Sequence, residues 1–178
     1  MSGEIYDPIQ RMTVTVSHQG DTAIIETRVE PGGGVPKHSH PTQAETFTLH
    51  SGTVRFKVGR AKVDAGPGDV VEVPPATKHS FRNRSDEEAS FRAALTPGGN
   101  AEGFFRDAAA IGNEGLVTKG GRPKSWRGLV RGAELLRRHR TEVVVYSPPP
   151  FLQRLFVPLL LHLAKSNGAK SPDWEASR

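Results

Sequence analysis

The first half of the chain is a succession of short segments rich in Val, Ile, Thr and Phe, many of which alternate apolar and polar residues. This alternation predicts β-strands, because successive side chains of a strand point to opposite faces of a sheet. The clearest segments are residues 12–17, 22–30, 45–50, 53–59, 69–74 and 89–95. Turn-forming pairs such as Gly20-Asp21 and Ser51-Gly52 separate them, and no helical stretch intervenes. The pattern predicts an antiparallel sandwich, jelly roll or barrel rather than a fold of alternating strands and helices.

The pattern changes after the Pro97-Gly98-Gly99-Asn100 turn. Residues 101–115 predict a short helix that ends at Gly112 or Gly115. Residues 126–140 predict an amphipathic helix, and residues 151–165 an apolar helix interrupted at Pro158. Residues 167–178 predict a polar tail. We therefore divide the chain into a β-barrel domain (1–97) and a helical, basic and apolar C-terminal extension (98–178).

The predicted amphipathic helix has one apolar face, and the residues around this face are largely basic. Trp126, Leu129, Ala133 and Leu136 recur at a spacing of three to four residues and are expected to face the rest of the protein. His139 lies within the Arg-rich end of this helix and is expected at the surface.

The basic character of the chain belongs to its last third. Residues 1–110 hold 12 Lys/Arg against 14 Asp/Glu, whereas residues 111–178 hold 12 against 5, a net +7. Two interpretations of the basic and apolar extension stay open: peripheral contact with an anionic membrane, or packing on the barrel or in a homodimer. No specific nucleic-acid binding is predicted, since no stacking platform or DNA-reading motif accompanies the basic residues.

The composition also limits the chemistry and the location. The chain has no cysteine, so disulfides and thiolate ligands are excluded and a bound metal must use nitrogen and oxygen ligands. The first residues, MSGEIYDPIQRM, lack the basic and apolar regions of a secretory signal, and we expect a cytoplasmic protein. The longest apolar stretch, residues 151–163, is far shorter than the ~20 residues that span a bilayer.

Three histidines and one glutamate form two clusters in the strand-rich part: His38, His40 and Glu45, and then His79. Side chains at i and i+2 of a strand share a face, so His38 and His40 can both point into a barrel. Glu45 can reach the same place after a short turn, and His79 is expected from a facing strand. This set suits Mn, Fe, Co, Ni, Cu or Zn, and suits Ca or Mg poorly. It leaves one or two open positions on a five- or six-coordinate metal, as a catalytic metal needs.

The spacing of these residues resembles the two sequence motifs of the cupins. Gly32, five residues, His38-x-His40, four residues, Glu45, six residues and Gly52 match the first motif. Gly68, five residues, Pro74, then His79, three residues and Asn83 match the second. One departure is Ala76, which stands where the second motif usually has glycine. The resemblance, to a small single-domain cupin of the type-2 kind, implies a mainly β double-stranded β-helix or jelly-roll barrel. It also implies one divalent transition metal held by His38, His40, Glu45 and His79.

Candidate substrate contacts follow from strand alternation. If Glu45 points inward, so does Phe47, and if His79 points inward, so does Phe81. They either line an apolar substrate pocket or simply fill the barrel. Gln43, between the ligands, is a third candidate for the pocket.

Cupins carry many chemistries, so the function is a choice among hypotheses. The first is a metal-dependent oxygenase-like enzyme acting on a small, partly apolar organic molecule. Iron is favoured ahead of manganese, nickel, copper or zinc, and Glu45 is the candidate catalytic base. The second hypothesis is a non-catalytic module that binds a metal or small ligand and docks on a partner or membrane through its tail. The third is a metal-dependent isomerase or epimerase, which would work without dioxygen.

Overall fold

The computed structural model describes residues 3–166, which form two antiparallel sheets followed by a layer of helices. The six-stranded sheet has the order β1-β2-β3-β10-β5-β8, and the five-stranded sheet has the order β11-β4-β9-β6-β7. The strands are β1 (Ile5–Asp7), β2 (Met12–Gln19), β3 (Thr22–Val29), β4 (Gly34–Ser39), β5 (Ala44–Ser51), β6 (Val54–Val58), β7 (Ala61–Ala65), β8 (Val70–Val73), β9 (His79–Asn83), β10 (Ala89–Thr96) and β11 (Val144–Val145). The helices are α1 (Ala101–Asn113), α2 (Trp126–Arg138) and α3 (Pro150–Ser166).

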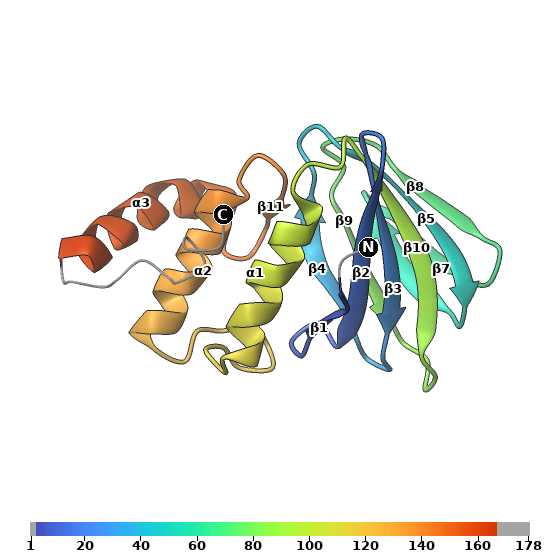
Figure 1. The fold of residues 1–178 in the computed structure, drawn as a ribbon, viewed down its shortest axis with the longest axis horizontal. Helices are drawn as coiled ribbons and strands as arrows, with labels where there is room; N and C mark the ends of the chain where they lie inside the picture. The colour runs from blue at the N-terminus through green and yellow to red at the C-terminus, as the bar shows by residue number, and fades with distance from the viewer. Residues whose placement is uncertain (1–2, 167–178) are drawn as a thin grey trace.

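The two sheets face each other and enclose an aromatic core (Figure 1). Phe47 of β5 and Phe56 of β6 come from different sheets, and their ring centroids lie 4.9 Å apart. Phe81 and Phe91 complete the cluster, each within 6.0 Å of Phe47. The alternating buried and accessible residues of β2, β5 and β10 confirm the predicted jelly-roll sandwich.

The start of β4 needs a glycine. Gly34 has a φ of +147°, and a Cβ at this position would collide with the backbone carbonyl of Phe81 on β9. β4 and β9 are therefore paired unusually closely at this end, which brings the first ligand strand against the strand that carries His79.

Ala76 takes a left-handed conformation in the turn before β9, with a φ of +59°. Its backbone N–H donates a hydrogen bond of 2.7 Å to the carbonyl of His40. The alanine therefore adopts the same backbone turn as a glycine would, but glycine would adopt it at a lower cost in free energy. The left-handed region costs an L-residue ~1–2 kcal/mol, a cost that glycine avoids. Glycine loses more backbone entropy on folding, which offsets part of this advantage.

We expect Ala76→Gly to stabilise the fold by about 0.5–1 kcal/mol, because it removes this strain. Urea denaturation of both proteins measures the change. Ala61→Gly is the matched control, since Ala61 is an exposed strand residue with an ordinary φ and its replacement is expected to destabilise. A loss of stability in Ala76→Gly as large as in the control would contradict the argument.

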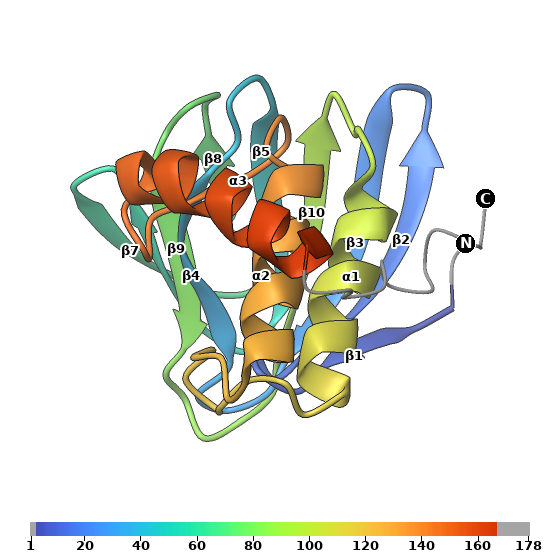
Figure 2. The same cartoon turned by 90° about the vertical axis from the view of Figure 1, so that its left-hand side faces the viewer.

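The helical layer is stacked outward from the six-stranded sheet. α1 packs on β1 and β2, α2 packs on α1, and α3 lies across α2 as the outermost element (Figures 1 and 2). α1 begins at Asn100, whose side chain accepts a hydrogen bond from the N–H of Gly103, and runs through Gly112, one of its two predicted ends. The division of the chain at residue 97 stays a prediction. The extension also contributes β11, which pairs with β4.

The face of α2 that contacts the rest of the protein differs from the predicted one. Trp126 and Leu129 are exposed, whereas Gly128 and Val130 are buried together with Ala133. The reason is Gly128, where a Cβ would collide with the backbone carbonyl of Leu116. This close approach fixes the rotation of the helix and turns the Trp126 side toward solvent.

His139 was expected at the surface and is instead buried, with 1% of its area exposed. Its Nε2 lies 2.9 Å from a carboxylate oxygen of Asp107 on α1, and its ring packs edge-on against Phe104. A partner 32 residues earlier in the chain therefore holds this histidine between α1 and α2. Within residues 3–166, none of the three helices combines the length and hydropathy needed to cross a bilayer.

Candidate metal centre and pocket

The four predicted ligand residues meet at one place between the sheets. His38 of β4 and His79 of β9 are directly opposite in register, His40 follows the end of β4, and Glu45 comes from β5 of the other sheet. One nitrogen of each histidine and one oxygen of Glu45 all lie within 4.8 Å of one another. His79 was expected from a facing strand, but β9 is the hydrogen-bonded neighbour of β4 in the same sheet. The facing strand is the one that carries Glu45.

Backbone carbonyls fix the tautomer of all three imidazoles. In each ring Nδ1 lies within hydrogen-bond distance of a carbonyl oxygen, which can only accept, so Nδ1 carries the proton. The acceptors are Pro36 for His38 at 2.9 Å, Thr77 for His79 at 2.9 Å, and Glu142 for His40 at 2.8 Å. Each Nε2 is then left with a free lone pair, the form in which histidine binds a metal.

Two of these ligand atoms are buried without a hydrogen-bond partner. Nε2 of His79 and an oxygen of Glu45 lie 2.9 Å apart, yet both are acceptors when Nδ1 of the ring carries the proton. Nε2 of His40 lies 3.5 Å from the same oxygen. Acceptors crowded at this distance repel unless a cation or a donor lies among them. Three nitrogen donors and a carboxylate therefore fit a divalent transition metal.

The charges of the site suit the same ion. Burial lowers the pKa of His38 to about 3, with help from His79, so this ring is neutral at neutral pH. Burial raises the pKa of the Glu45 carboxyl. Hydrogen bonds from His40 and His79, in the form in which Nε2 carries a proton, outweigh burial and lower the pKa to about 2. Burial lowers the pKa of His40, but the Glu45 carboxylate outweighs it and raises the pKa. Glu45 is therefore ionised and ready to bind a cation.

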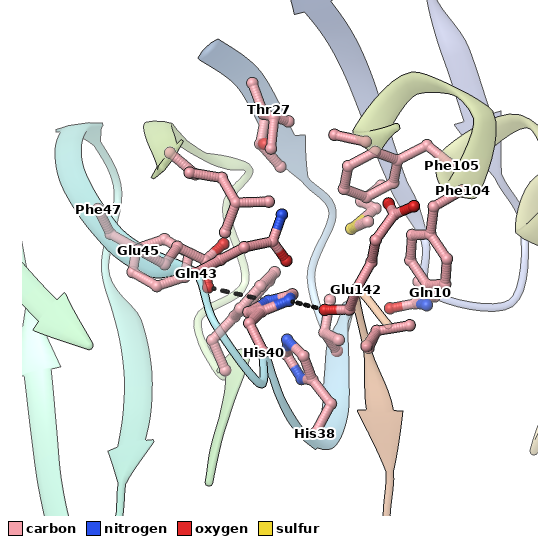
Figure 3. Close-up of a pocket in the computed structure, with 18 of the residues that line it drawn as sticks. Gln10, Thr27, His38, His40, Gln43, Glu45, Phe47, Phe104, Phe105 and Glu142 are labelled. Carbon is pink, nitrogen blue, oxygen red and sulfur yellow. Dashed lines mark hydrogen bonds and ion pairs between the residues drawn. The ribbon is translucent and has the colours of Figure 1, made fainter. Parts of the chain in front are cut away.

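The ligand cluster opens into an apolar cavity of about 100 Å³ (Figure 3). The predicted pocket residues Gln43, Phe47 and Phe81 all line it, and the two phenylalanines also belong to the core. Phe47 and Phe81 therefore both fill the barrel and form the cavity wall. Their contact with a substrate stays a prediction.

The extension closes one side of this cavity, which sequence reasoning missed. Phe104 and Phe105 of α1 and Glu142, Val143 and Val145 near β11 all line it. The backbone carbonyl of Glu142 also holds His40 (Figure 3). The only signal for this arrangement in the sequence is the apolar pair Phe104-Phe105, which is equally typical of a buried helix face.

The pKa of His38 gives a pH dependence in the metal-free protein. The unfolded histidine takes a proton near pH 6.5, whereas the folded one takes it only near pH 3, so stability is lost as the pH falls between these values. Between pH 7 and 5 we expect the metal-free protein to lose more stability than the variant His38→Gln, by on the order of 1–2 kcal/mol. Urea denaturation after chelation measures this. Parallel curves for the two proteins would contradict the assignment, and the exposed His18→Gln is the control.

Comparisons with known proteins agree with this architecture. A family model described as "Cupin domain" matches residues 25–96. An RmlC-like cupin from Shewanella frigidimarina has a TM-score of 0.50 at 15% identity, over 56% of this chain and 87% of the other. A cupin-2 domain from Rhodospirillum rubrum has a TM-score of 0.45 at 27% identity, over 48% and 60%. The Cnp3 cupin domain of Schizosaccharomyces pombe has a TM-score of 0.45 at 15% identity, over 48% and 64%.

This chain thus covers less than two thirds of the R. rubrum and S. pombe chains. No curated protein matches it. At 15% identity and a TM-score of 0.50, the Shewanella structure shows likeness of fold alone and says nothing of the reaction.

Proposed function

Residues 25–96 are a cupin domain of the type-2 kind, and from that premise we propose that the chain is a metal-dependent, oxygenase-like enzyme acting on a small, largely apolar organic molecule. The observation that carries the proposal is the position of the ligand cluster. Three imidazole lone pairs and an ionised carboxylate face a cavity whose other walls are mostly apolar. A metal site that served only the fold would have no need of such a cavity.

Different residues of the site have different roles in the proposed reaction. His38, His40 and His79 hold the ion, with their rings oriented by backbone carbonyls. When bound, an iron or a similar ion supplies dioxygen activation or polarises a substrate oxygen as a Lewis acid. Glu45, ionised at neutral pH, is a ligand and also a base that can accept a proton from the substrate. The extension contributes apolar wall to the cavity through Phe104 and Phe105.

Oxygen consumption by the iron-loaded protein tests the proposal. With a panel of phenolic and diketone-like compounds, we expect turnover that requires both the metal and dioxygen. Turnover under strictly anaerobic conditions would support the isomerase or epimerase hypothesis instead. A fully loaded protein that transforms no compound of the panel in air or under nitrogen would favour the non-catalytic module.

We also propose that α3 docks the protein on an anionic membrane surface. Five large apolar side chains of this helix are exposed, each by 44% or more: Phe151, Leu155, Phe156, Leu159 and Leu163. The helix has no acidic residue, and Arg154 and Lys165 are exposed beside the apolar ones. Apolar side chains flanked by positive charge are what an interfacial helix presents to anionic lipid. Pairing of α3 with a second copy would instead bring two acid-free helices together, with repulsion between them.

Vesicle flotation distinguishes binding of α3 to a membrane from pairing of α3 with a second copy of the chain. We expect the full chain to float with phosphatidylcholine vesicles containing phosphatidylserine, and roughly tenfold less protein to float when Leu155 and Leu159 are both changed to glutamate. Val63→Glu is the matched control, because Val63 is an exposed apolar residue of β7, far from α3 (Figure 1). A wild-type dimer that stays off the vesicles and becomes monomeric in the Leu155/Leu159 variant would overturn the membrane proposal in favour of self-association.

A further inference from the structure

Gln43 presents an unused hydrogen-bond acceptor to the cavity beside the ligand cluster. Its side chain is buried, with 3% of the residue exposed, and Nε2 donates a hydrogen bond of 2.7 Å to the carbonyl of Pro97. A carbonyl cannot donate, so this bond fixes which end of the amide is nitrogen. The oxygen Oε1 is therefore directed away from Pro97, and it is buried without a hydrogen-bond partner.

A neutral His40 cannot satisfy this oxygen. Gln43 and His40 both line the cavity (Figure 3). In the neutral Nδ1–H tautomer, His40 offers a lone pair in the same region. Both groups are then acceptors, so Oε1 of Gln43 needs a donor from elsewhere in the cavity, while Nε2 of His40 stays free for the metal.

The other polar groups of the cavity wall carry no positive charge. Glu142 contributes a carboxylate that already accepts a hydrogen bond from the N–H of Asn100. Gln10 contributes an amide, whose oxygen is buried without a partner and whose nitrogen can donate. Thr27 contributes a hydroxyl, which can donate or accept. None of the described lining residues is Lys or Arg. A phosphate ester would therefore bury its charge without a cationic side chain to pair with.

The apolar walls limit the rest of the ligand. Phe47, Phe81 and Phe91 on the sheets and Phe104 and Phe105 on α1 surround the cavity. Aromatic walls favour the edge and face contacts of an aromatic ring. The volume of about 100 Å³ is smaller than that of an engineered cavity of about 150 Å³ that binds benzene. The buried part of a ligand is therefore no larger than one ring.

We infer that the cavity binds a monocyclic aromatic molecule with a hydroxyl group, and that Gln43 is the residue that selects this hydroxyl by accepting its hydrogen bond. The inference rests on the proposed function, since it names the substrate class of the same site. It assigns to Gln43 a role in specificity and orientation rather than in holding the metal.

A matched pair of probes tests the inference by calorimetric titration. Phenol carries the donor, and fluorobenzene has nearly the same shape without one. The full-length protein is loaded with Zn²⁺, which excludes turnover. We expect phenol to bind at least about tenfold more tightly, although water solvates it better than fluorobenzene. The same preference is expected after chelation, because it depends on Gln43.

A variant assigns the preference to the amide oxygen. Gln43→Leu removes the acceptor, and we expect the ratio of the two affinities to fall to about two or less. Zinc content and thermal midpoint are measured for this variant, and the comparison of the two probes on the wild-type protein needs no variant.

The failures are distinguishable. A wild-type protein that binds Zn²⁺ but has no preference for the phenol overturns the inference and leaves the metal site intact. A preference that persists in Gln43→Leu overturns the role of Gln43. Loss of Zn²⁺ binding in the wild-type protein counts against the proposed function, and the chelated protein then still tests the cavity.

Discussion

Replacing His40 by alanine is expected to lower the affinity of the protein for a divalent transition metal by at least about 100-fold and to abolish activity with it. Changes in the residues that merely orient metal ligands cost about 10–100-fold, and this change removes a ligand itself. It also leaves the Glu142 carbonyl without its donor and an oxygen of Glu45 with only His79 beside it. Metal analysis of protein purified without chelators, followed by titration with Fe²⁺ or Mn²⁺, measures the loss.

His50→Ala is the control for this experiment. His50 lies on β5 close to Glu45 in sequence, but its side chain is 46% exposed and its ring lies 3.7 Å from a carboxylate of Glu26 outside the ligand cluster. It removes the same chemical group from the same strand without touching the cavity, so metal content is expected to stay unchanged. Activity that persists in metal-free His40→Ala protein would show that the reaction proceeds without the ion.

The ligand cluster could be predicted from the sequence because it depends on short spacings between residues that are close in the chain. The i, i+2 spacing places His38 and His40 on one side of a strand, and alternation from Glu45 gives the inward direction of Phe47. The spacing does not show which strands are neighbours in a sheet. The pairing of β4 with β9 depends on the close approach at Gly34, so His79 was assigned to the wrong sheet although its role as a candidate ligand was recognised.

The contribution of the extension depends on contacts that no local pattern encodes. The carbonyl that holds His40 belongs to Glu142, 102 residues away, and any residue type there offers the same atom. His139 looked like part of a solvated basic run, because its partner Asp107 is on another helix. The rotation of α2 follows from one glycine at a crossing, which outweighs the apolar spacing of Trp126 and Leu129.

The core beneath the cavity gives the largest expected effect on stability. Phe47 is 1% exposed, and its ring packs on Phe56, Phe91 and Phe81 at centroid distances of 4.9, 5.5 and 6.0 Å. We expect Phe47→Ala to lower the free energy of unfolding by about 3–5 kcal/mol, from lost burial and from the space left behind. Urea denaturation measures the loss, and an unchanged slope with denaturant shows that it is a change in stability.

The neighbouring strand provides the control, because Val70→Ala on β8 also shortens an apolar side chain but at a position that is 56% exposed. Its expected cost is within about 0.5 kcal/mol, as for other surface changes. A cost below about 1 kcal/mol for Phe47→Ala would mean that the aromatic cluster collapses into the space or that water fills it from the cavity. Because Phe47 also lies 6.4 Å from the ring of His79, such a collapse would move the ligand cluster. The metal affinity of the same variant therefore shows whether the aromatic wall of the cavity stays in place or collapses toward the space left by Phe47.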